Sequence, residues 1–240
     1  MGRKILITGA SRGIGRAIAE QFASLGDDLY LTCIHNKEKL ESLSKELSDR
    51  YHVQCKTFVC DCGDSPSVKE LFSQIGDIDV VINNAGVAHI GLLSDMTDDE
   101  WRRLMSTNLD SVFYTSRAAI PLMLKKHSGR IVNITSVWGS VGASCEVAYS
   151  ASKGGVNSFT RALAKELAPS GIAVNAVSCG VIDTDMNRDH LSEEDLEELK
   201  GEIPADRLGD PKEVAQVVAK VCEMPVYMTG QIITVDGGWI

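Results

Sequence analysis

Short apolar runs recur along this chain, and longer stretches with apolar residues at helical spacing separate them. Most of the runs are rich in valine and isoleucine throughout and show no alternating polar face, which is typical of strands buried on both faces of a parallel sheet. The segments that this pattern predicts as strands are residues 4–8, 29–34, 53–59, 79–82, 130–134, 173–177 and 232–235.

The intervening stretches predict helices, and the regular alternation of the two predicts the fold class. The expected helices span residues 13–25, 37–51, 67–75, 98–126 and 148–167. Such a succession favours an α/β fold, a Rossmann-type doubly wound parallel sheet of about seven strands with helices on both faces. Because no repeat or low-complexity linker interrupts it, we expect residues 1–240 to form a single domain for dinucleotide binding and catalysis.

A glycine-rich turn follows the first predicted strand and precedes a helix. Gly9, Gly13 and Gly15 give the spacing Gly-x-x-x-Gly-x-Gly, which differs from the GxGxxG of many dinucleotide sites. Glycine permits a positive φ and the close approach of backbone NH groups to a pyrophosphate, and the helix N-terminus favours its negative charge. A structural turn without function is the alternative, but this position in a parallel sheet favours a nucleotide-phosphate loop.

The sequence of this turn, TGASRGIG from Thr8 to Gly15, resembles the cofactor fingerprint of the short-chain dehydrogenase/reductase family. The resemblance covers essentially the whole chain, to the VDGGW segment at residues 235–239. It implies that the turn binds a nicotinamide dinucleotide through Gly9, Ser11, Arg12, Gly13, Ile14 and Gly15.

Tyr149 and Lys153 lie four residues apart on a predicted helix, and therefore one turn apart on the same face. Free tyrosine has a pKa of about 10, so it is a poor acid or base at neutral pH. We expect the adjacent ammonium, together with the positive ring of an oxidised nicotinamide, to lower that pKa and to make proton transfer to the substrate oxygen feasible. The pair alone is a weak signal, because an aromatic residue at helical spacing usually packs in a core.

Further motifs of the family stand in the expected order. Ser136 lies 13 residues before Tyr149, and its hydroxyl is expected to hold the substrate oxygen. Asn108 matches the family's fourth catalytic position, where the resemblance implies a water relay with Lys153. The resemblance also implies that further residues contact the cofactor. These are Asn84, Ala85 and Gly86 of an NNAG motif, Tyr149, Lys153, Gly180, Ile182 and Thr184.

Two features bear on which nicotinamide cofactor is used. NAD-selective enzymes of this fold place an acid near the end of the second strand, and residues 31–36 contain none. Arg12 can instead pair with a 2'-phosphate, so NADP(H) is expected, although a solvated turn arginine is the alternative. His35, Asn36 and Lys37 are further candidates for the phosphate. Asp61 matches a family position that contacts adenine, but an ordinary turn aspartate explains it equally well.

The net charge and the cysteine content indicate which partners are disfavoured and in which compartment the protein is expected. The formal net charge of -9 opposes binding to nucleic acid and to anionic membranes. The apolar run at residues 5–7 is too short for a signal peptide or a membrane span, and a cytoplasmic location is expected. The seven cysteines are odd in number and lack paired CxxC spacing. A metal cluster at Cys55, Cys60 and Cys62 is the less favoured alternative to small buried thiols, and no metal is expected.

The motifs together resemble most closely a 3-oxoacyl-acyl-carrier-protein reductase of fatty acid biosynthesis, usually a homotetramer. A reductase or dehydrogenase of a small ketone, sugar or steroid-like alcohol is the alternative within enzymes. A non-catalytic dinucleotide sensor is disfavoured, because such proteins commonly lack the Tyr or Lys, whereas all four catalytic positions are present here.

Substrate recognition is less well determined by the sequence. A lid is expected around residues 185–205, and the residues expected to line or cover the pocket are His89, Trp138, Cys145, Glu146 and segment 186–202. Carrier-protein reductases have two basic residues beside the entrance, where this chain has His127 and Ser170. Neither carries a dependable positive charge at neutral pH, so acyl-carrier-protein is expected to be a weak partner. The replacement of the family's proline by Cys179 is expected to leave cofactor binding intact.

Overall fold

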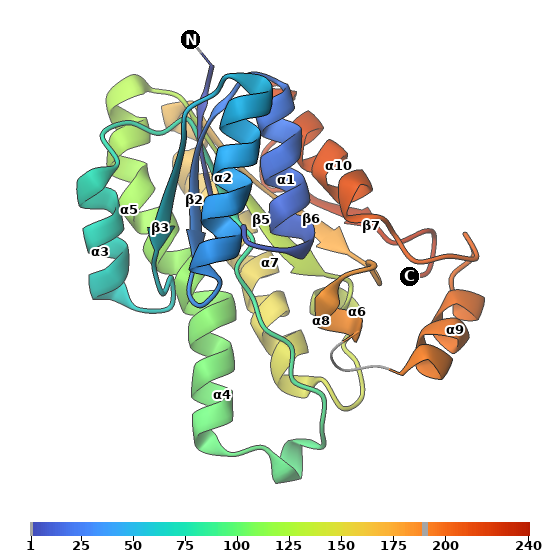
Figure 1. Ribbon diagram of the computed structural model, residues 1–240. Coiled ribbons are helices and arrows are strands. Elements are labelled where there is room, and N and C mark those ends of the chain that lie inside the picture. The colour runs from blue at the N-terminus through green and yellow to red at the C-terminus, as the bar shows by residue number, and fades with distance from the viewer. Residues whose placement is uncertain (1, 189–191) are drawn as a thin grey trace.

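The strands of this protein pair in parallel in one seven-stranded sheet, in the order β3-β2-β1-β4-β5-β6-β7. The computed structural model describes residues 2–188 and 192–240, and Figure 1 shows helices in front of and behind this sheet. The predicted fold class is therefore confirmed. The strands are β1 (Lys4–Ile7), β2 (Asp28–Cys33), β3 (Cys55–Val59), β4 (Val80–Asn83), β5 (Gly129–Ser136), β6 (Ile172–Cys179) and β7 (Ile232–Val235).

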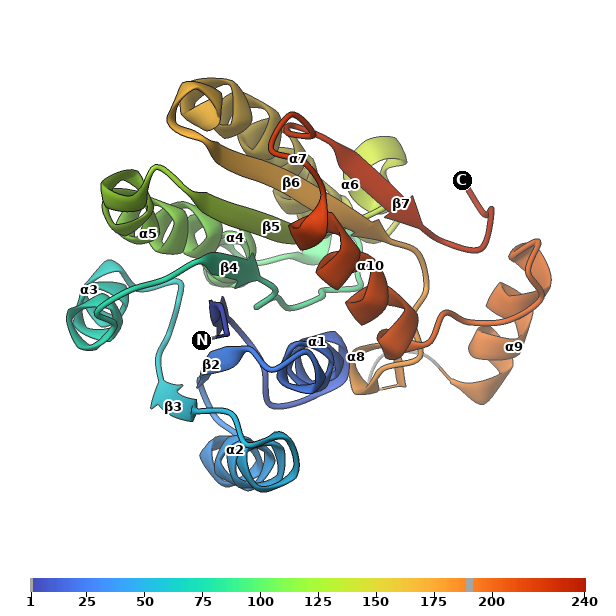
Figure 2. The ribbon, with the colours of Figure 1, turned by 90° about the horizontal axis from the view of Figure 1, so that it is seen from above.

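The helices divide between the two faces of the sheet, with α1, α2 and α10 on one face and α3, α5 and α7 on the other (Figure 2). The main helices are α1 (Gly13–Ser24), α2 (Lys37–Tyr51), α3 (Ser65–Gln74), α4 (Asp98–Met105), α5 (Ser111–Lys126), α7 (Val147–Leu167), α9 (Glu193–Glu202) and α10 (Pro211–Glu223). The short ones are η1 (Leu93–Asp95), η2 (Ser106–Asp110), α6 (Trp138–Val141), η3 (Ala168–Ser170) and α8 (Asp185–Arg188). None of the helices in the described part of the chain has the length and apolarity that a membrane span requires.

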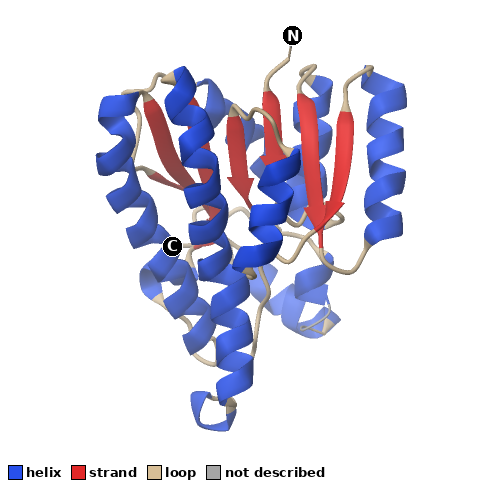
Figure 3. Ribbon diagram, turned by 90° about the vertical axis from the view of Figure 1, so that its left-hand side faces the viewer, coloured by secondary structure: helices blue, strands red, loops and turns tan. Residues whose placement is uncertain are grey.

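Consecutive apolar residues of each strand serve two separate cores, because side chains along a strand point alternately to opposite faces. Ile5 and Ile7 of β1 belong to the core beneath α1, α2 and α10, whereas Leu6 between them belongs to the core beneath α3, α5 and α7. All three are fully buried. This explains why the strands lack a polar face, and Figure 3 shows the helix layers that cover the sheet on each side.

The structure corrects several of the expected elements and adds a helix that was not expected. The predicted helix over residues 98–126 is interrupted at η2, a π-helical turn between α4 and α5 in which the NH of Ser111 donates to the carbonyl of Ser106. The third strand begins at Cys55 instead of residue 53, and the strands at β5 and β6 each extend farther than expected. Helix α10 was not predicted, although Asp210 caps it and Pro211 begins it.

The order of the strands places a topological switch between β1 and β4. The chain runs from β1 outwards through β2 to β3, and it then crosses to β4 on the other side of β1. Ligands of such sheets bind beyond the carboxyl ends of the strands at this point. In Figure 1 that end of the sheet faces α4, α8 and α9. Of the lid expected around residues 185–205, the structure describes α8 and α9, and residues 189–191 lie outside the described residues.

Candidate active site

The glycine turn between β1 and α1 adopts the conformation that its sequence predicts. Gly9 and Gly13 have φ values of +65° and +55°, which L side chains rarely adopt. A Cβ on Gly15 would lie 2.3 Å from the carbonyl oxygen of Gly9, so no larger residue fits the first turn of α1 without a shift of the backbone. The turn and the N-terminus of α1 line a cavity, so the field of the helix N-terminus acts on whatever binds there.

A cavity of about 280 Å³ opens over this turn, and it collects every residue that the sequence analysis assigned to the cofactor. These residues come from the glycine turn, the ends of β3 to β6 and helix α7. They are Gly9, Ser11, Arg12, Gly13, Ile14, Gly15, Asp61, Asn84, Ala85, Gly86, Tyr149, Lys153, Gly180, Ile182 and Thr184. Their convergence on one cavity fits a dinucleotide stretched across the switch point.

Hydrogen bonds between Thr8 and Asn84 fix the glycine turn against the NNAG segment. The Asn84 amide Nδ2 donates to the carbonyl oxygens of Thr8 (2.9 Å) and Gly9 (3.1 Å). The Thr8 hydroxyl accepts from the backbone NH groups of Asn84 (2.9 Å) and Ala85 (3.0 Å). The floor of the cavity is therefore held in place by the protein itself, which lowers the cost of ordering it when a ligand binds.

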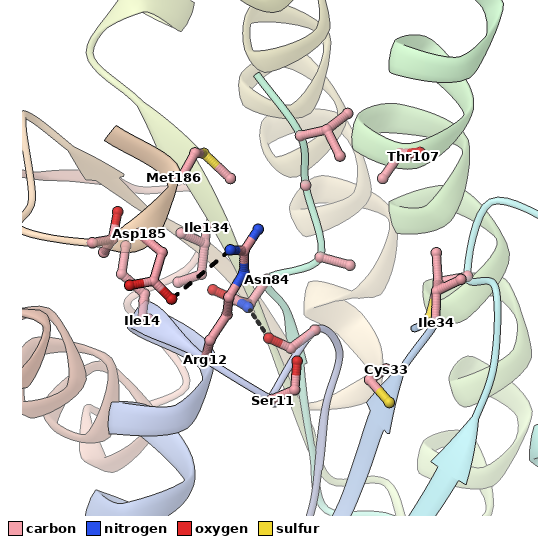
Figure 4. A pocket seen from close by; sticks show the side chains of 18 of the residues that line it. Ser11, Arg12, Ile14, Cys33, Ile34, Asn84, Thr107, Ile134, Asp185 and Met186 are labelled. Carbon is pink, nitrogen blue, oxygen red and sulfur yellow. Dashed lines mark hydrogen bonds and ion pairs between the residues drawn. The ribbon is translucent and has the colours of Figure 1, made fainter. Parts of the chain in front are cut away.

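Arg12 lies at the N-cap of α1 and its side chain reaches across the mouth of the cavity towards Asp185 (Figure 4). The distance from Arg12 Nη1 to Asp185 Oδ2 is 3.8 Å, and both side chains are about half exposed. His35 and Asn36, which follow β2, also line the cavity. This part of the cavity wall therefore offers a guanidinium and an imidazole, and none of residues 31–36 is an acid.

Asp61 lines the same end of the cavity and also has a local structural role. Its Oδ1 accepts a hydrogen bond of 2.8 Å from the NH of Gly63, as an ordinary turn aspartate does. Several neighbours at this end of the cavity were not expected from the sequence. They are Thr32, Cys33, Ile34, Cys60, Cys62, Gly63 and Thr107. Most are small or apolar residues at strand ends, which carry no signal that distinguishes a cavity wall from a core.

Ser136, Tyr149 and Lys153 meet at the other end of the cavity. Ser136 is the last residue of β5, and its hydroxyl hydrogen bonds with the phenol of Tyr149. Lys153 lies one turn farther along α7, with its Nζ 5.6 Å from the centroid of the Tyr149 ring. The ammonium donates to the carbonyl oxygen of Ile134 at 3.1 Å, which fixes it behind the phenol. The side chains predicted to do the chemistry are therefore brought together.

Burial controls the protonation of this cluster. Lys153 is only 5% exposed, and desolvation lowers its pKa to about 8. Desolvation also raises the pKa of Tyr149 above its ordinary value, with a smaller contribution in the same direction from the charge of Glu146. In the protein without a bound cofactor, the loss of solvent therefore dominates the pKa of Tyr149. The expected lowering depends on Lys153 together with the positive ring of an oxidised nicotinamide, and it stays a prediction. A lowered pKa at Tyr149 requires a further positive charge at the site.

Asn108 lies in the π-turn η2 and is almost fully buried. Its Nδ2 donates to the carbonyl of Val87 (2.9 Å) and to the hydroxyl of Ser152 (3.1 Å), and its Oδ1 accepts from the NH of Val87 (2.8 Å). It does not line the cavity directly. A Cβ on Gly86 would lie 3.4 Å from Asn108 Oδ1 and 3.5 Å from Lys153 Nζ, so Asn108 and the ammonium flank the same glycine. π-turns within helices often mark functional sites.

Cys179 takes the position of the family's proline at the end of β6, where it lines the cavity beside Lys153. Burial raises the pKa of its thiol to about 12, so the thiol stays protonated and is a poor nucleophile. Gly180 is required here, since a Cβ would lie 2.7 Å from the Cβ of Asp236.

Of the residues expected around the substrate, Met186 and Asn187 line the cavity, whereas His89, Trp138, Cys145 and Glu146 do not. Two of these lie beyond it in the turn that precedes α7. The carbonyl of Cys145 accepts from the NH of Gly91 at 2.8 Å, which joins this turn to the loop after β4.

Comparison with known proteins shows the family. A model described as short chain dehydrogenase matches residues 3–195. This chain belongs to the short-chain dehydrogenase/reductase family. It is accordingly an oxidoreductase with the family's nicotinamide dinucleotide fold, and the glycine turn, the NNAG segment and the tyrosine–lysine pair lie within the matched residues.

Several members of the short-chain dehydrogenase/reductase family match it over their full length. An uncharacterized oxidoreductase, YmfI of Bacillus subtilis, is 39% identical over 100% of this chain and 99% of its own. The 3-oxoacyl-[acyl-carrier-protein] reductase FabG of Haemophilus influenzae is 42% identical over 99% and 98% of the two chains. A crystal structure of a variant actinorhodin polyketide ketoreductase with NADPH is 34% identical, with a TM-score of 0.93 over 99% of this chain and 97% of that one.

Proposed function

We propose that this protein is an NADP(H)-dependent reductase that converts a ketone into an alcohol, or catalyses the reverse reaction. The observation that carries the proposal is the meeting of Ser136, Tyr149 and Lys153 at one end of a cavity whose other end is a glycine turn. A hydroxyl, a phenol and an ammonium so placed suit protonation of a carbonyl oxygen.

The residues of the cavity fit a nicotinamide dinucleotide. The glycine turn, which lines the cavity and whose Gly15 has no room for a side chain, would hold the pyrophosphate. The nicotinamide end would lie beside Lys153, Gly180 and Thr184. When bound, NADPH supplies the hydride for the carbonyl carbon. Arg12 and the acid-free end of β2 support NADP(H) over NAD(H), because a guanidinium pairs with a 2'-phosphate and an acid there would repel it.

Within this proposal each catalytic side chain has one task. The Ser136 hydroxyl donates a hydrogen bond to the substrate oxygen and holds it beside Tyr149. The Tyr149 phenol gives its proton to that oxygen as the carbonyl carbon is reduced, which leaves a phenolate and an alcohol. Lys153 stabilises the phenolate through its positive charge, and Asn108 supports the relay that returns a proton to it.

Two substrate classes are compatible with this chemistry. The relatives named as 3-oxoacyl-[acyl-carrier-protein] reductases support a 3-oxoacyl thioester, and a small ketone is the alternative. The carrier protein itself is a poor match. The family's two basic positions hold His127 and Ser170, which precede β5 and β6 at the edge of the sheet opposite the cavity. The expectation that they lie beside the entrance is therefore wrong within this chain. A homotetrameric assembly is part of the proposal and rests on the family resemblance.

The test is an initial-rate screen of ketones and acetoacetyl thioesters with NADPH, followed by Tyr149→Phe on the best substrate. Removal of the phenolic proton donor is expected to lower kcat by roughly a hundredfold or more and to leave NADPH affinity nearly unchanged. Tyr227→Phe is the matched control, since Tyr227 is fully exposed. A Tyr149→Phe enzyme with near-native turnover would contradict the assignment.

A further inference from the structure

Asp185, the first residue of α8, places a carboxylate in the wall of the large cavity (Figure 4). A carboxylate is an unexpected neighbour for a nicotinamide dinucleotide, because the pyrophosphate and the 2'-phosphate of NADPH are themselves negatively charged. Asp61 also lines this cavity, but its Oδ1 is used within its own turn, where it accepts from the NH of Gly63. The carboxylate of Asp185 is instead directed at a cation on the opposite side of the cavity.

That cation is the guanidinium of Arg12. Its Nη1 lies 3.8 Å from Oδ2 of Asp185, and a dashed line in Figure 4 marks the pair. Arg12 belongs to the glycine turn after β1, whereas Asp185 follows β6, so the pair joins two segments that border the cavity. The same segments also approach each other beside the pair, since a Cβ on Gly13 would lie 3.5 Å from Cγ2 of Thr184. The ion pair therefore lies next to the turn that we propose holds the pyrophosphate.

Hydrogen bonds on either side of Asp185 hold its backbone in place. The NH of Asn187 donates to the carbonyl of Thr184 at 3.1 Å, and the side-chain Nδ2 of Asn187 donates to the carbonyl of Ile182 at 2.7 Å. The guanidinium of Arg12, by contrast, ends a long side chain that is about half exposed. When a competing anion enters the cavity, Arg12 is therefore the partner that changes its position.

The strength of the pair decides how the two anions share one guanidinium. The distance of 3.8 Å is longer than the roughly 2.7–2.9 Å of a charged N–H···O hydrogen bond, and both side chains are about half exposed. An exposed pair of this kind contributes roughly 0.2–1 kcal/mol. A guanidinium binds a phosphate more strongly, through two parallel hydrogen bonds. Arg12 therefore turns to a 2'-phosphate when one is bound, at a cost set by the lost contact with Asp185.

We propose that Asp185 is a specificity-determining residue, which pairs with Arg12 in the protein without cofactor and competes with the 2'-phosphate of NADP(H) for its guanidinium. The affinity for NADPH is then lower than Arg12 alone would give. NADH carries no 2'-phosphate and does not draw Arg12 away in this manner, so the preference for NADPH over NADH is reduced. The inference rests on the proposed binding of NADP(H) and names a residue that limits this specificity.

Direct repulsion between the Asp185 carboxylate and the phosphates of the cofactor is the simpler alternative, and it predicts different results. Repulsion acts whether or not Arg12 is present, and through the pyrophosphate it weakens the binding of NADH as well. Competition acts through the guanidinium, so it disappears when Arg12 is removed. Substitution of the two residues singly and together therefore distinguishes the two effects.

The experiment measures the dissociation constants of NADPH and NADH by titration calorimetry on the full chain, without substrate. Asp185→Asn keeps the shape of the side chain and removes its charge, and we expect it to tighten NADPH binding by roughly two- to fivefold and to change NADH binding less. In an Arg12→Ala background the same substitution should leave the NADPH constant unchanged. Asp183→Asn is the matched control, because it changes the net charge equally at a residue that pairs with Arg188 at 2.7 Å. It should alter neither constant.

The outcomes separate the inference from the proposed function. If NADPH does not bind the unaltered protein, the proposed cofactor is wrong and the inference fails with it. If NADPH binds but Asp185→Asn leaves its dissociation constant unchanged, the competition is wrong and the proposed cofactor stands. A gain that persists in full in the Arg12→Ala background is due to direct repulsion, and it also overturns the competition. A gain for NADPH that is lost in that background supports it.

Discussion

Lys153 imposes a pH-dependent cost on folding, and a single substitution should remove it. The ammonium is almost fully buried, and desolvation lowers its pKa from 10.5 to about 8. The gap between these two values corresponds to roughly 3 kcal/mol. Lys153→Met replaces the cation with an uncharged side chain of similar length. It is expected to raise the free energy of unfolding at neutral pH by roughly 2 kcal/mol, after roughly 1 kcal/mol is subtracted for the lost bond to Ile134.

The sign of the pH dependence follows from the proton balance. Well below pH 8 the folded and unfolded chains both hold the Lys153 proton, and the folded protein bears the full cost of a buried charge. Between pH 8 and 10.5 the folded protein has released the proton while the unfolded chain keeps it, so the free energy of unfolding rises with pH. The advantage of Lys153→Met should therefore shrink by roughly 1.4 kcal/mol between about pH 7 and about pH 9.

Urea unfolding, followed by tryptophan fluorescence without added cofactor, measures this difference. Cys179 and Cys222, whose pKa values burial raises to about 12, act in the opposite direction above neutral pH. They are present in both proteins and largely cancel in the comparison. Lys165→Met, an exposed position on the same helix, is the control and should show no change with pH. An advantage of Lys153→Met that stays constant or grows with pH would refute the reasoning.

Three other predictions address the cofactor, the glycine turn and the carrier. Arg12→Ala is expected to weaken NADPH binding roughly tenfold while NADH binding changes little, and equal losses in titrations of both would contradict a 2'-phosphate contact. Gly15→Ala should lower the free energy of unfolding, measured in urea, by roughly 1–3 kcal/mol, because its Cβ would lie 2.3 Å from a carbonyl oxygen. Gly76→Ala is the control, since its Cβ would meet nothing within 4 Å, and it should change that free energy little. An acetoacetyl carrier protein should show no higher kcat/KM than a small acetoacetyl thioester, and a strong preference for the carrier that vanishes in high salt would contradict this.

The parallel sheet and the gathering of the expected cofactor residues in one cavity could be predicted from the sequence, because both depend on local signals. Strands such as β1 are apolar on both faces, so the parallel sheet could be recognised without knowledge of their partners. The residues expected at the cofactor line one cavity because they follow strand ends, and the carboxyl ends of parallel strands share one edge. Helix α10 was missed although Asp210, Pro211 and Glu213 form a recognisable capping box, so that signal was present in the sequence.

Other features depend on packing that no local pattern records. The π-turn at Asn108 inserts one residue into a helix whose periodicity on either side is ordinary, so the sequence predicts a continuous helix. The pKa of Tyr149 is set mainly by the solvent that surrounding elements exclude, and this depends on the complete fold. The contact between Trp138 and Trp239 joins residues from α6 and the end of the chain, which only the folded structure brings together.

The switch between β1 and β4 also determines how the chain is assembled as it is synthesised. β1 lies inside the finished sheet, next to the central strand β4, and one of its edges pairs with β2, which follows soon after it. Its other edge pairs with β4, as in the pair of Ile5 with Val80, and this pairing can form only after β4 has been synthesised. At roughly 5–20 residues per second, a ribosome needs several seconds to make the intervening chain. During that time this edge of β1, formed by Ile5, Leu6 and Ile7, has no strand with which to pair. The nascent protein is therefore most exposed to aggregation and to chaperones before β4 emerges.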